Sequence, residues 1–148
     1  MTIKLKKLTE TAQVPTYSTE NSAGLDLRAD IKEAMTLYPG ERVLIPTGLS
    51  MEIPSGKVGL VCSRSGLAIK HGIAVLNAPG IIDADFRGEI KVILINLGTQ
   101  NKDLFVIRPN DRIAQLAITD YNYVNFSVTT ELTETQRGEG GFGSSGVS

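Results

Sequence analysis

Glycine and proline turn signals recur along the chain at intervals that leave room only for short elements of secondary structure. The signals are Pro39-Gly40, Pro54-Ser55-Gly56, Pro79-Gly80, Gly98-Thr99 and Arg108-Pro109-Asn110-Asp111. The apolar runs between them are too short for most helices but long enough for strands. The spacing therefore predicts many brief strands joined by tight turns, which is typical of an all-β sandwich, jelly roll or small barrel.

Alternating apolar and polar residues support the strand prediction. In each of two segments, every second residue is apolar, so these residues lie on one face of that strand. The two sets are Leu49, Met51 and Ile53, and Val58, Leu60 and Cys62. The segment 91–96 reads KVILIN, so we expect a central strand that is buried on both faces. Further strands are expected at 3–8, 25–29, 42–47, 73–76, 104–107, 113–118 and 125–129.

One segment favours a helix, and the end of the chain favours no regular structure. Ser65 can cap a short helix over 65–71, and Gly72 can end it. The last residues, RGEGGFGSSGVS, have one large apolar side chain and predict a flexible tail. The same glycines would also let the backbone wrap a phosphate-bearing ligand closely. We expect one β domain over 1–136 and a C-terminal tail over 137–148.

The composition narrows the class of protein. A chain of 148 residues with 41% hydrophobic residues can form one domain with a core. Its formal charge of -1 argues against stable binding of nucleic acid through its phosphates but permits a small polyanionic ligand. A single cysteine excludes an internal disulfide framework and fits a reducing compartment. No apolar run is long enough for a signal peptide or membrane span, so we expect a cytoplasmic protein with no membrane partner.

The inventory of reactive side chains removes several mechanisms. The chain has one histidine and one cysteine, which are too few for a metal cluster of the zinc type. Cys62 stands at an apolar strand position, where buried packing is a commoner role than nucleophilic attack. Carboxylate, hydroxyl, amide and guanidinium groups remain as the chemistry that this chain can use.

Three segments carry such groups in suggestive positions, and each also has an ordinary structural explanation. Arg64-Ser65-Gly66 suits phosphate oxygens or forms a plain helix start with a surface arginine. In the segment 77–88, Asp83 holds a water for attack, or Asp83 and Asp85 merely shape a turn. Gln115 lies in a core-like strand, so its amide bonds either the backbone or a ligand.

Five separated segments together resemble the five motifs of the trimeric dUTPases, the deoxyuridine 5′-triphosphate nucleotidohydrolases. The segments, in chain order, read AGLDL at 23–27, RSGLA at 64–68, NAPGIIDADFRG at 77–88, RIAQL at 112–116 and RGEGGFG at 137–143. Their order and spacing match over most of the chain, whereas RSG alone would mean little. The resemblance implies a jelly-roll-like fold and a homotrimer with active sites at subunit interfaces. It also implies Mg²⁺-dependent cleavage of dUTP to dUMP and pyrophosphate, which keeps uracil out of DNA and supplies dUMP for dTTP synthesis.

The resemblance implies roles for the residues of the third motif. Asp83 would orient and deprotonate the attacking water. Asn77 and the backbone of Gly80, Ile81, Ile82 and Asp83 would form a uracil pocket. Such a pocket excludes cytosine, whose amino group would leave polar groups unpaired, and excludes thymine through its methyl group.

The resemblance likewise assigns the phosphates and the metal. Ser65 and Gly66 would contact phosphate, with Arg64 bracing either the phosphates or the subunit junction. Gln115 would reach the phosphate chain, and Lys91 matches a position that can contact substrate. Asp26 would hold Mg²⁺ through water, which suits an ion that keeps most of its waters.

The tail gains a function from the resemblance, and two positions depart from the family pattern. Arg137 would bind the γ-phosphate and Phe142 would stack on uracil, so 137–148 would act as a lid. Phe86 stands where the family usually has a tyrosine packed on the deoxyribose, and it keeps the ring without the hydroxyl. Ser63 stands where the family usually has a proline.

Two other functions remain open from the sequence. A dCTP deaminase of the same fold would use a glutamate as its proton shuttle, and Glu89 follows the third motif. A non-catalytic β-fold nucleotide-binding module would keep the architecture without the reaction.

Overall fold

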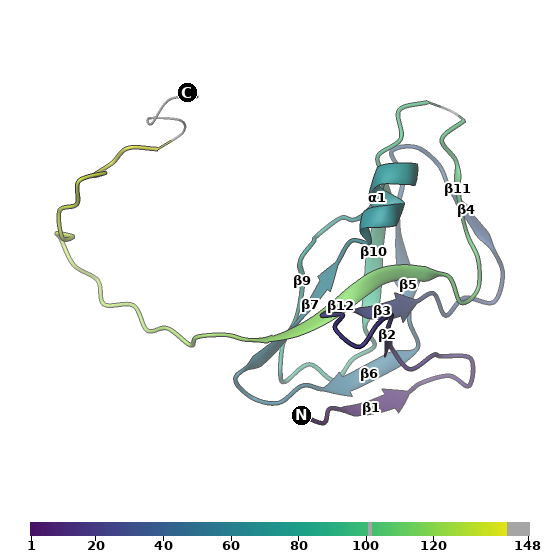
Figure 1. Ribbon diagram of the computed structural model, residues 1–148, viewed down its shortest axis with the longest axis horizontal. Helices are drawn as coiled ribbons and strands as arrows, with labels where there is room; N and C mark the ends of the chain where they lie inside the picture. The colour runs from purple at the N-terminus through teal and green to yellow at the C-terminus, as the bar shows by residue number, and fades with distance from the viewer. Residues whose placement is uncertain (101, 142–148) are drawn as a thin grey trace.

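The computed structural model describes residues 1–100 and 102–141 as an all-β body with one short helix and a long C-terminal segment (Figure 1). Phe142 lies outside the described residues. The body contains β1 (Lys4–Lys7), β2 (Thr16–Tyr17), β3 (Leu25–Arg28), β4 (Met35–Leu37), β5 (Arg42–Pro46), β6 (Leu49–Glu52), β7 (Lys57–Cys62), α1 (Ser65–His71), β8 (Ile73–Val75), β9 (Gly80–Ile82), β10 (Lys91–Asn96), β11 (Phe105–Ile107) and β12 (Arg112–Asp120). The prediction of an all-β fold with one helix is confirmed.

The strands pair antiparallel in four sheets that enclose one apolar core. The largest sheet has the order β2-β3-β12-β7-β9, and a second has the order β5-β10-β8. Two-stranded sheets, β1-β6 and β11-β4, complete the body. The core contains fully buried aliphatic side chains from all four sheets, among them Leu27, Ile45, Leu49, Leu94 and Ile107.

Burial on two strands differs from the prediction. Strand β10 lies between β5 and β8 as expected, but in the single chain only one of its faces is fully buried. Val92 and Leu94 face the core, whereas Ile93 and Ile95 are half-buried. On β7 the core side is that of Gly59 and Val61, so Cys62 is half-buried and not the buried packing residue that its parity predicts.

The helix forms where the sequence predicts it, but its first residue acts differently. Arg64 is the N-cap residue, and no side chain of the described residues caps the helix, so the prediction that Ser65 caps it is wrong. Gly72 ends the helix in the left-handed conformation with φ 65°, as expected of a glycine there. Among the described residues, no helix has the length and apolar character needed to cross a membrane.

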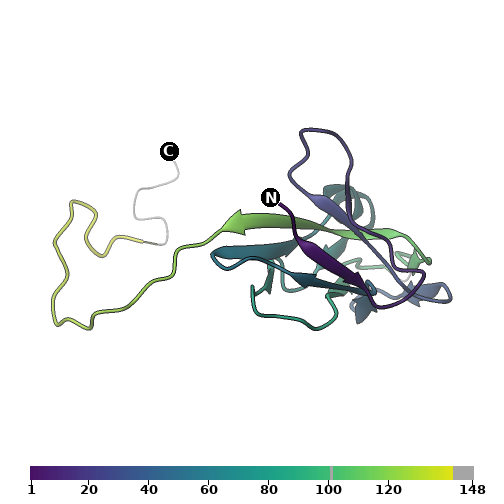
Figure 2. The ribbon, with the colours of Figure 1, turned by 90° about the horizontal axis from the view of Figure 1, so that it is seen from below.

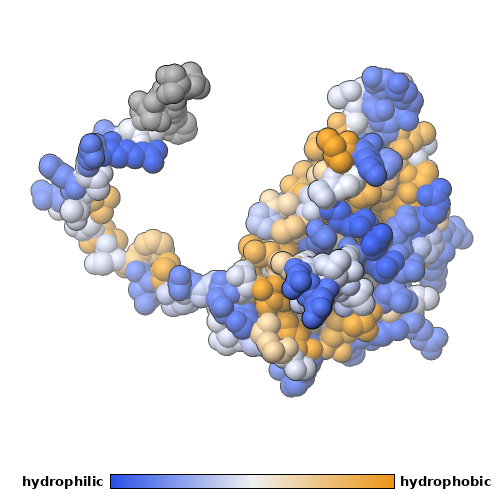
Figure 3. Space-filling view, in the orientation of Figure 1, coloured by the Kyte–Doolittle hydropathy of each residue, from blue (hydrophilic) through white to orange (hydrophobic). Residues whose placement is uncertain are grey.

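The chain leaves the body after β12. Residues 121–141, here called the arm, extend away from the sheets (Figures 1 and 2). The predicted strand at 125–129 is wrong for the single chain, because residues 1–100 and 102–141 provide no neighbouring strand there to complete its hydrogen bonds. Phe126 and Val128 are 92% and 99% exposed, and apolar side chains along the arm are open to solvent in Figure 3.

Candidate active site

A small pocket lies in the hairpin region that connects β9 to β10. It has a volume of about 210 Å³, and its lining includes six residues that the sequence assigns to the substrate: Asn77, Gly80, Ile81, Ile82, Phe86 and Lys91. Strand β9 is held at the sheet edge by pairing with β7, in register from Gly59–Ile82 to Val61–Gly80. A β carbon at Gly80 would lie 3.2 Å from Nδ2 of Asn77, so the glycine leaves room for that side chain.

Glu89 and Lys91 form an ion pair on the wall of this pocket. The Lys91 Nζ atom lies 3.4 Å from Oε2 of Glu89. The other carboxylate oxygen, Oε1, accepts the backbone N–H of Gly48 at 2.9 Å. Both oxygens of Glu89 therefore have partners in the protein, and the carboxylate orients Lys91.

The turn between the two strands is held by its own hydrogen bonds. The Phe86 N–H donates to the Asp83 carbonyl at 3.2 Å. The Arg87 guanidinium donates to the carbonyls of Ala84 and Phe86 at 2.7 and 2.9 Å. These contacts fix the Asp83 backbone relative to Phe86.

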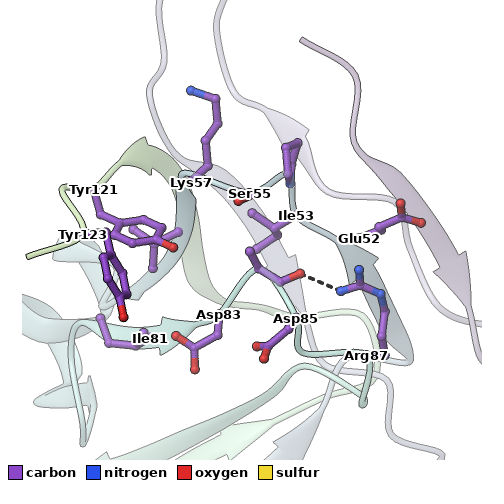
Figure 4. Close-up of a pocket in the computed structure, with 13 residues that line it drawn as sticks. Glu52, Ile53, Ser55, Lys57, Ile81, Asp83, Asp85, Arg87, Tyr121 and Tyr123 are labelled. Atoms are coloured by element: carbon purple, nitrogen blue, oxygen red, sulfur yellow. Dashed lines mark hydrogen bonds between the residues drawn. The ribbon is translucent and has the colours of Figure 1, made fainter.

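Asp83 faces a second, larger cavity of about 910 Å³ (Figure 4). This cavity lies between the hairpin, the connection from β6 to β7, and the first residues of the arm. The carboxylates of Asp83 and Asp85 point into it, and Tyr121 and Tyr123 line its wall nearby. Ile81 lines both cavities, so it lies between the small pocket and the cavity that the Asp83 carboxylate faces. Asp83 is exposed, which leaves its carboxylate open to a water molecule.

A cluster of charged residues forms on the largest sheet. Asp26, on β3, is only 4% exposed. Its Oδ1 atom lies 3.2 Å from Nε of Arg64, and its Oδ2 atom lies 3.3 Å from Nη1 of Arg112. Ser18 Oγ also donates to Oδ2, and Nη1 of Arg64 donates to the Arg112 carbonyl at 3.1 Å. We call Asp26, Arg64 and Arg112 the charge cluster.

The geometry of Asp26 suits a metal that is held through water. Oδ1 has no hydrogen-bond partner in the described part of the chain, because the nearby Nε–H of Arg64 is not aimed at it. The two guanidinium groups carry one more charge than the single carboxylate, so direct binding of a cation there is unfavourable. No group of three or more His, Cys, Asp or Glu in 1–100 and 102–141 could hold a metal. The free acceptor at Oδ1 is suited to a metal-bound water, with the direct oxygens of the metal coming from phosphates.

The other predicted phosphate contacts lie beside the charge cluster. Gln115 on β12 pairs in register with Asp26 on one side and with Cys62 on the other. Its side chain packs over Gly24, where a β carbon would lie 3.4 Å from Cδ of the glutamine. Gln115 is half-buried, not fully buried as its strand position suggests. Ser65 begins α1 just after β7, and its side chain is exposed.

Two parts of the predicted site are not brought to the pocket in the single chain. The charge cluster, Gln115, Ser65 and Gly66 line neither of the two cavities near the hairpin. Arg137 lies on the arm, where its Nε atom donates to the Gly140 carbonyl at 2.8 Å.

Sequence reasoning missed the role of Arg112. This arginine reaches a carboxylate 86 positions earlier in the chain, and its own strand gives no sign of such a partner. The only local signal was its place at the start of the RIAQL motif.

An exposed carboxylate beside a small pocket can hold a water for attack on a ligand bound there. A model of the dUTPase family matches residues 10–146. The chain belongs to the dUTPase family, as its motifs predict.

Named relatives agree with this placement. The deoxyuridine 5′-triphosphate nucleotidohydrolase of Rickettsia akari is 52% identical, over 98% of this chain and 97% of its own. That of Chlamydia pneumoniae is 53% identical over 92% of each chain. A variant dUTPase of Staphylococcus bacteriophage 80alpha, solved with dUpNHpp, has a TM-score of 0.89 at 29% identity and 99% coverage of both chains. A variant dUTPase from phage phi11 of S. aureus, whose structure describes a structural Mg(II) ion, has a TM-score of 0.80 at 25% identity, with 88% of this chain and 98% of its own covered.

Replacing Asp26 with asparagine should destabilise the protein, because Arg64 and Arg112 then lose their counter-charge while the side-chain shape is kept. We expect the free energy of unfolding to fall by about 1–2 kcal/mol, since both arginines are partly exposed and water screens their charge. Urea unfolding at fixed protein concentration measures the change. Glu52→Gln breaks the exposed pair with Lys4 and serves as the control, with an expected loss below about 0.5 kcal/mol. Equal stability of Asp26→Asn and wild type would contradict the expectation.

Proposed function

We propose that the protein hydrolyses dUTP to dUMP and pyrophosphate, with the uracil in the hairpin pocket and Asp83 as the base. The protein is a dUTP diphosphatase, an assignment that follows from its family and from identity of about half its residues to curated dUTPases. The observation that best supports the proposed residues is the pocket itself. Six residues assigned to the substrate line it, and the open carboxylate of Asp83 stands beyond Ile81.

In this proposal a water molecule attacks the α-phosphorus of dUTP in line with the bond to be broken. Asp83 accepts a proton from that water as its oxygen bonds to phosphorus. The bond from the α-phosphorus to the bridging oxygen breaks, and pyrophosphate leaves with the electron pair. A positioned general base of this kind typically contributes about 10²- to 10⁴-fold to the rate.

The size of the hairpin pocket supports recognition of the base alone. A volume of about 210 Å³ is below that of pockets which enclose whole drug-sized ligands. Asn77 and the backbone groups from Gly80 to Asp83 pair with the uracil edge, and Phe86 lies against the sugar. Cytosine is rejected because its amino group would leave buried polar groups unpaired.

The phosphates belong beside the charge cluster. Ser65, Gly66 and Gln115 contact them, Arg64 adds positive charge, and the unpartnered Oδ1 of Asp26 accepts a metal-bound water. Lys91 contacts the substrate from the wall of the hairpin pocket. Mg²⁺, when bound, offsets the negative charge of the triphosphate.

We also propose a homotrimer whose active sites combine residues from different subunits. The pocket and the charge cluster do not share a cavity in one chain. On the arm, Val124, Phe126 and Val128 alternate as strand residues do, and they are 60%, 92% and 99% exposed. A strand of this kind is stable only against a partner, and a neighbouring subunit provides one. Residues 137–148 then close over bound nucleotide, with Arg137 on the γ-phosphate and Phe142 on uracil.

The two alternative functions have less support. A deaminase needs a glutamate that is free to carry protons, but both oxygens of Glu89 are engaged, by Gly48 and Lys91. A non-catalytic module has no use for a carboxylate held open beside the base pocket, as that of Asp83 is.

A pyrophosphate-release assay with dUTP, dCTP, dTTP and UTP, with and without Mg²⁺, tests the function. We expect turnover of dUTP alone at an appreciable rate, and only with Mg²⁺, because the pocket excludes the other bases and the metal offsets phosphate charge. Ammonia release from dCTP without pyrophosphate from dUTP would establish the deaminase instead. Binding of dUTP with no product at all would favour the module.

Asp83→Asn should remove most turnover, at least about 100-fold, while leaving the affinity for dUTP largely intact. The amide cannot take a proton from water, yet it keeps the size of the carboxylate. Single-turnover assays and calorimetric titration with a non-hydrolysable dUTP analogue separate the two effects. Asp85→Asn, on the same turn and facing the same cavity, is the matched control and should retain most activity. Turnover like that of wild type in Asp83→Asn would refute the role of base.

Removing 137–148 should leave a folded trimer with poor activity, because the lid is lost while the apolar part of the arm remains. Light scattering after size exclusion should give three times the 15.9 kDa of one chain for wild type, and three times the smaller mass of its own chain for this variant. Phe126→Ser with Val128→Ser should instead weaken the trimer, since both side chains need cover. A trimer lost on removal of 137–148, or unaffected by the double substitution, would contradict this arrangement.

A further inference from the structure

Gly88 has no room for a side chain, and the obstacle is the ring of Phe86. A β carbon at Gly88 would lie 2.6 Å from Cζ and 2.9 Å from Cε2 of that ring. Gly88 is not one of the glycines with positive φ, so its backbone conformation is open to any residue. The glycine is therefore required by the aromatic ring that lies on it, and not by the turn.

Hydrogen bonds to β6 and to Gly48, which precedes β6, hold the backbone on both sides of Gly88. The buried Ser50 hydroxyl donates to the Arg87 carbonyl at 2.7 Å. The Ile90 N–H donates to the Leu49 carbonyl at 2.8 Å, and the Glu89 carboxylate accepts the Gly48 N–H. With these anchors in place, a side chain added at Gly88 is accommodated by movement of the ring and not of the backbone.

The position of the Phe86 ring is determined by packing alone. Phenylalanine has no polar atom through which a hydrogen bond could hold it. Its backbone is fixed by the bonds to Asp83 and Arg87, but the residue as a whole is 41% exposed on the wall of the hairpin pocket. Gly88 is thus the surface against which the ring rests.

We propose that Gly88 is a positioning residue that sets the Phe86 ring against the sugar of the substrate and thereby determines the preference for 2′-deoxyribose over ribose. This inference rests on the proposed function. An apolar ring in contact with the sugar leaves a 2′-hydroxyl without water or another partner, and an unpaired buried hydroxyl is costly. The penalty depends on close contact, so a displaced ring discriminates less.

A double-mutant cycle on Gly88 and Phe86 tests the inference, with kcat and KM measured for dUTP and UTP. Gly88→Ala should lower the ratio of kcat/KM for dUTP to that for UTP by about 10-fold or more, a methyl-sized effect on selectivity. The KM for dUTP should rise more than kcat falls, because the ring contacts sugar and not the reacting phosphate. The melting temperature should stay within a few degrees of wild type, since only the end of a side chain must move.

The background variant Phe86→Ala is the matched control. It should lose selectivity by itself, and adding Gly88→Ala to it should change nothing further, because the two residues act through one contact. If Gly88→Ala alone fails to fold, folding of the double variant would still support the ring contact.

Three results would overturn the inference. They are unchanged selectivity in a folded Gly88→Ala protein, a further loss in the double variant, or unfolding of both variants alike. Failure of the wild-type protein to hydrolyse dUTP would instead refute the proposed function, so the two failures are distinct.

Discussion

The hydrogen-bond register of one antiparallel sheet determines where the candidate site forms. Strand β12 pairs with β3 on one side and β7 on the other, which sets Gln115 between Asp26 and Cys62. Strand β9 pairs with the outer edge of β7, and this pairing fixes the position of the hairpin along β7. A slip of one residue in any of these pairings would turn the site residues to the opposite face of the sheet. The active-site chemistry therefore depends on backbone pairing before it depends on any side chain.

The charge cluster fixes the orientation of side chains on that sheet. A carboxylate that is 4% exposed is stable in its charged form only when cations or donors face it, and Arg64 and Arg112 supply them. The same contacts orient Arg64 at the start of α1, next to Ser65. A structural ion pair and the proposed binding of phosphate thus use the same groups.

Features that depend on local geometry could be predicted from the sequence, and those that depend on distant or absent partners could not. The glycine after α1 and the positions of most strands follow from turn chemistry and alternation. The pairing of Arg112 with Asp26 joins residues 86 positions apart, so no local pattern contains it. The residues at 125–129 have strand character, but a strand needs a neighbour, and the part of the chain that the structure describes has none there. For the same reason the outward face of β10 is more exposed than its composition suggests.

Because the arm exposes apolar side chains, the association of this protein with further copies depends on its concentration. Phe126 and Val128 are almost fully exposed to water in a lone chain, so association that buries them is favourable, and mass action makes its extent depend on protein concentration. On dilution that association is lost, together with every function that requires a second subunit. For an enzyme assembled as proposed above, activity would fall more than in proportion to protein concentration once the subunits separate.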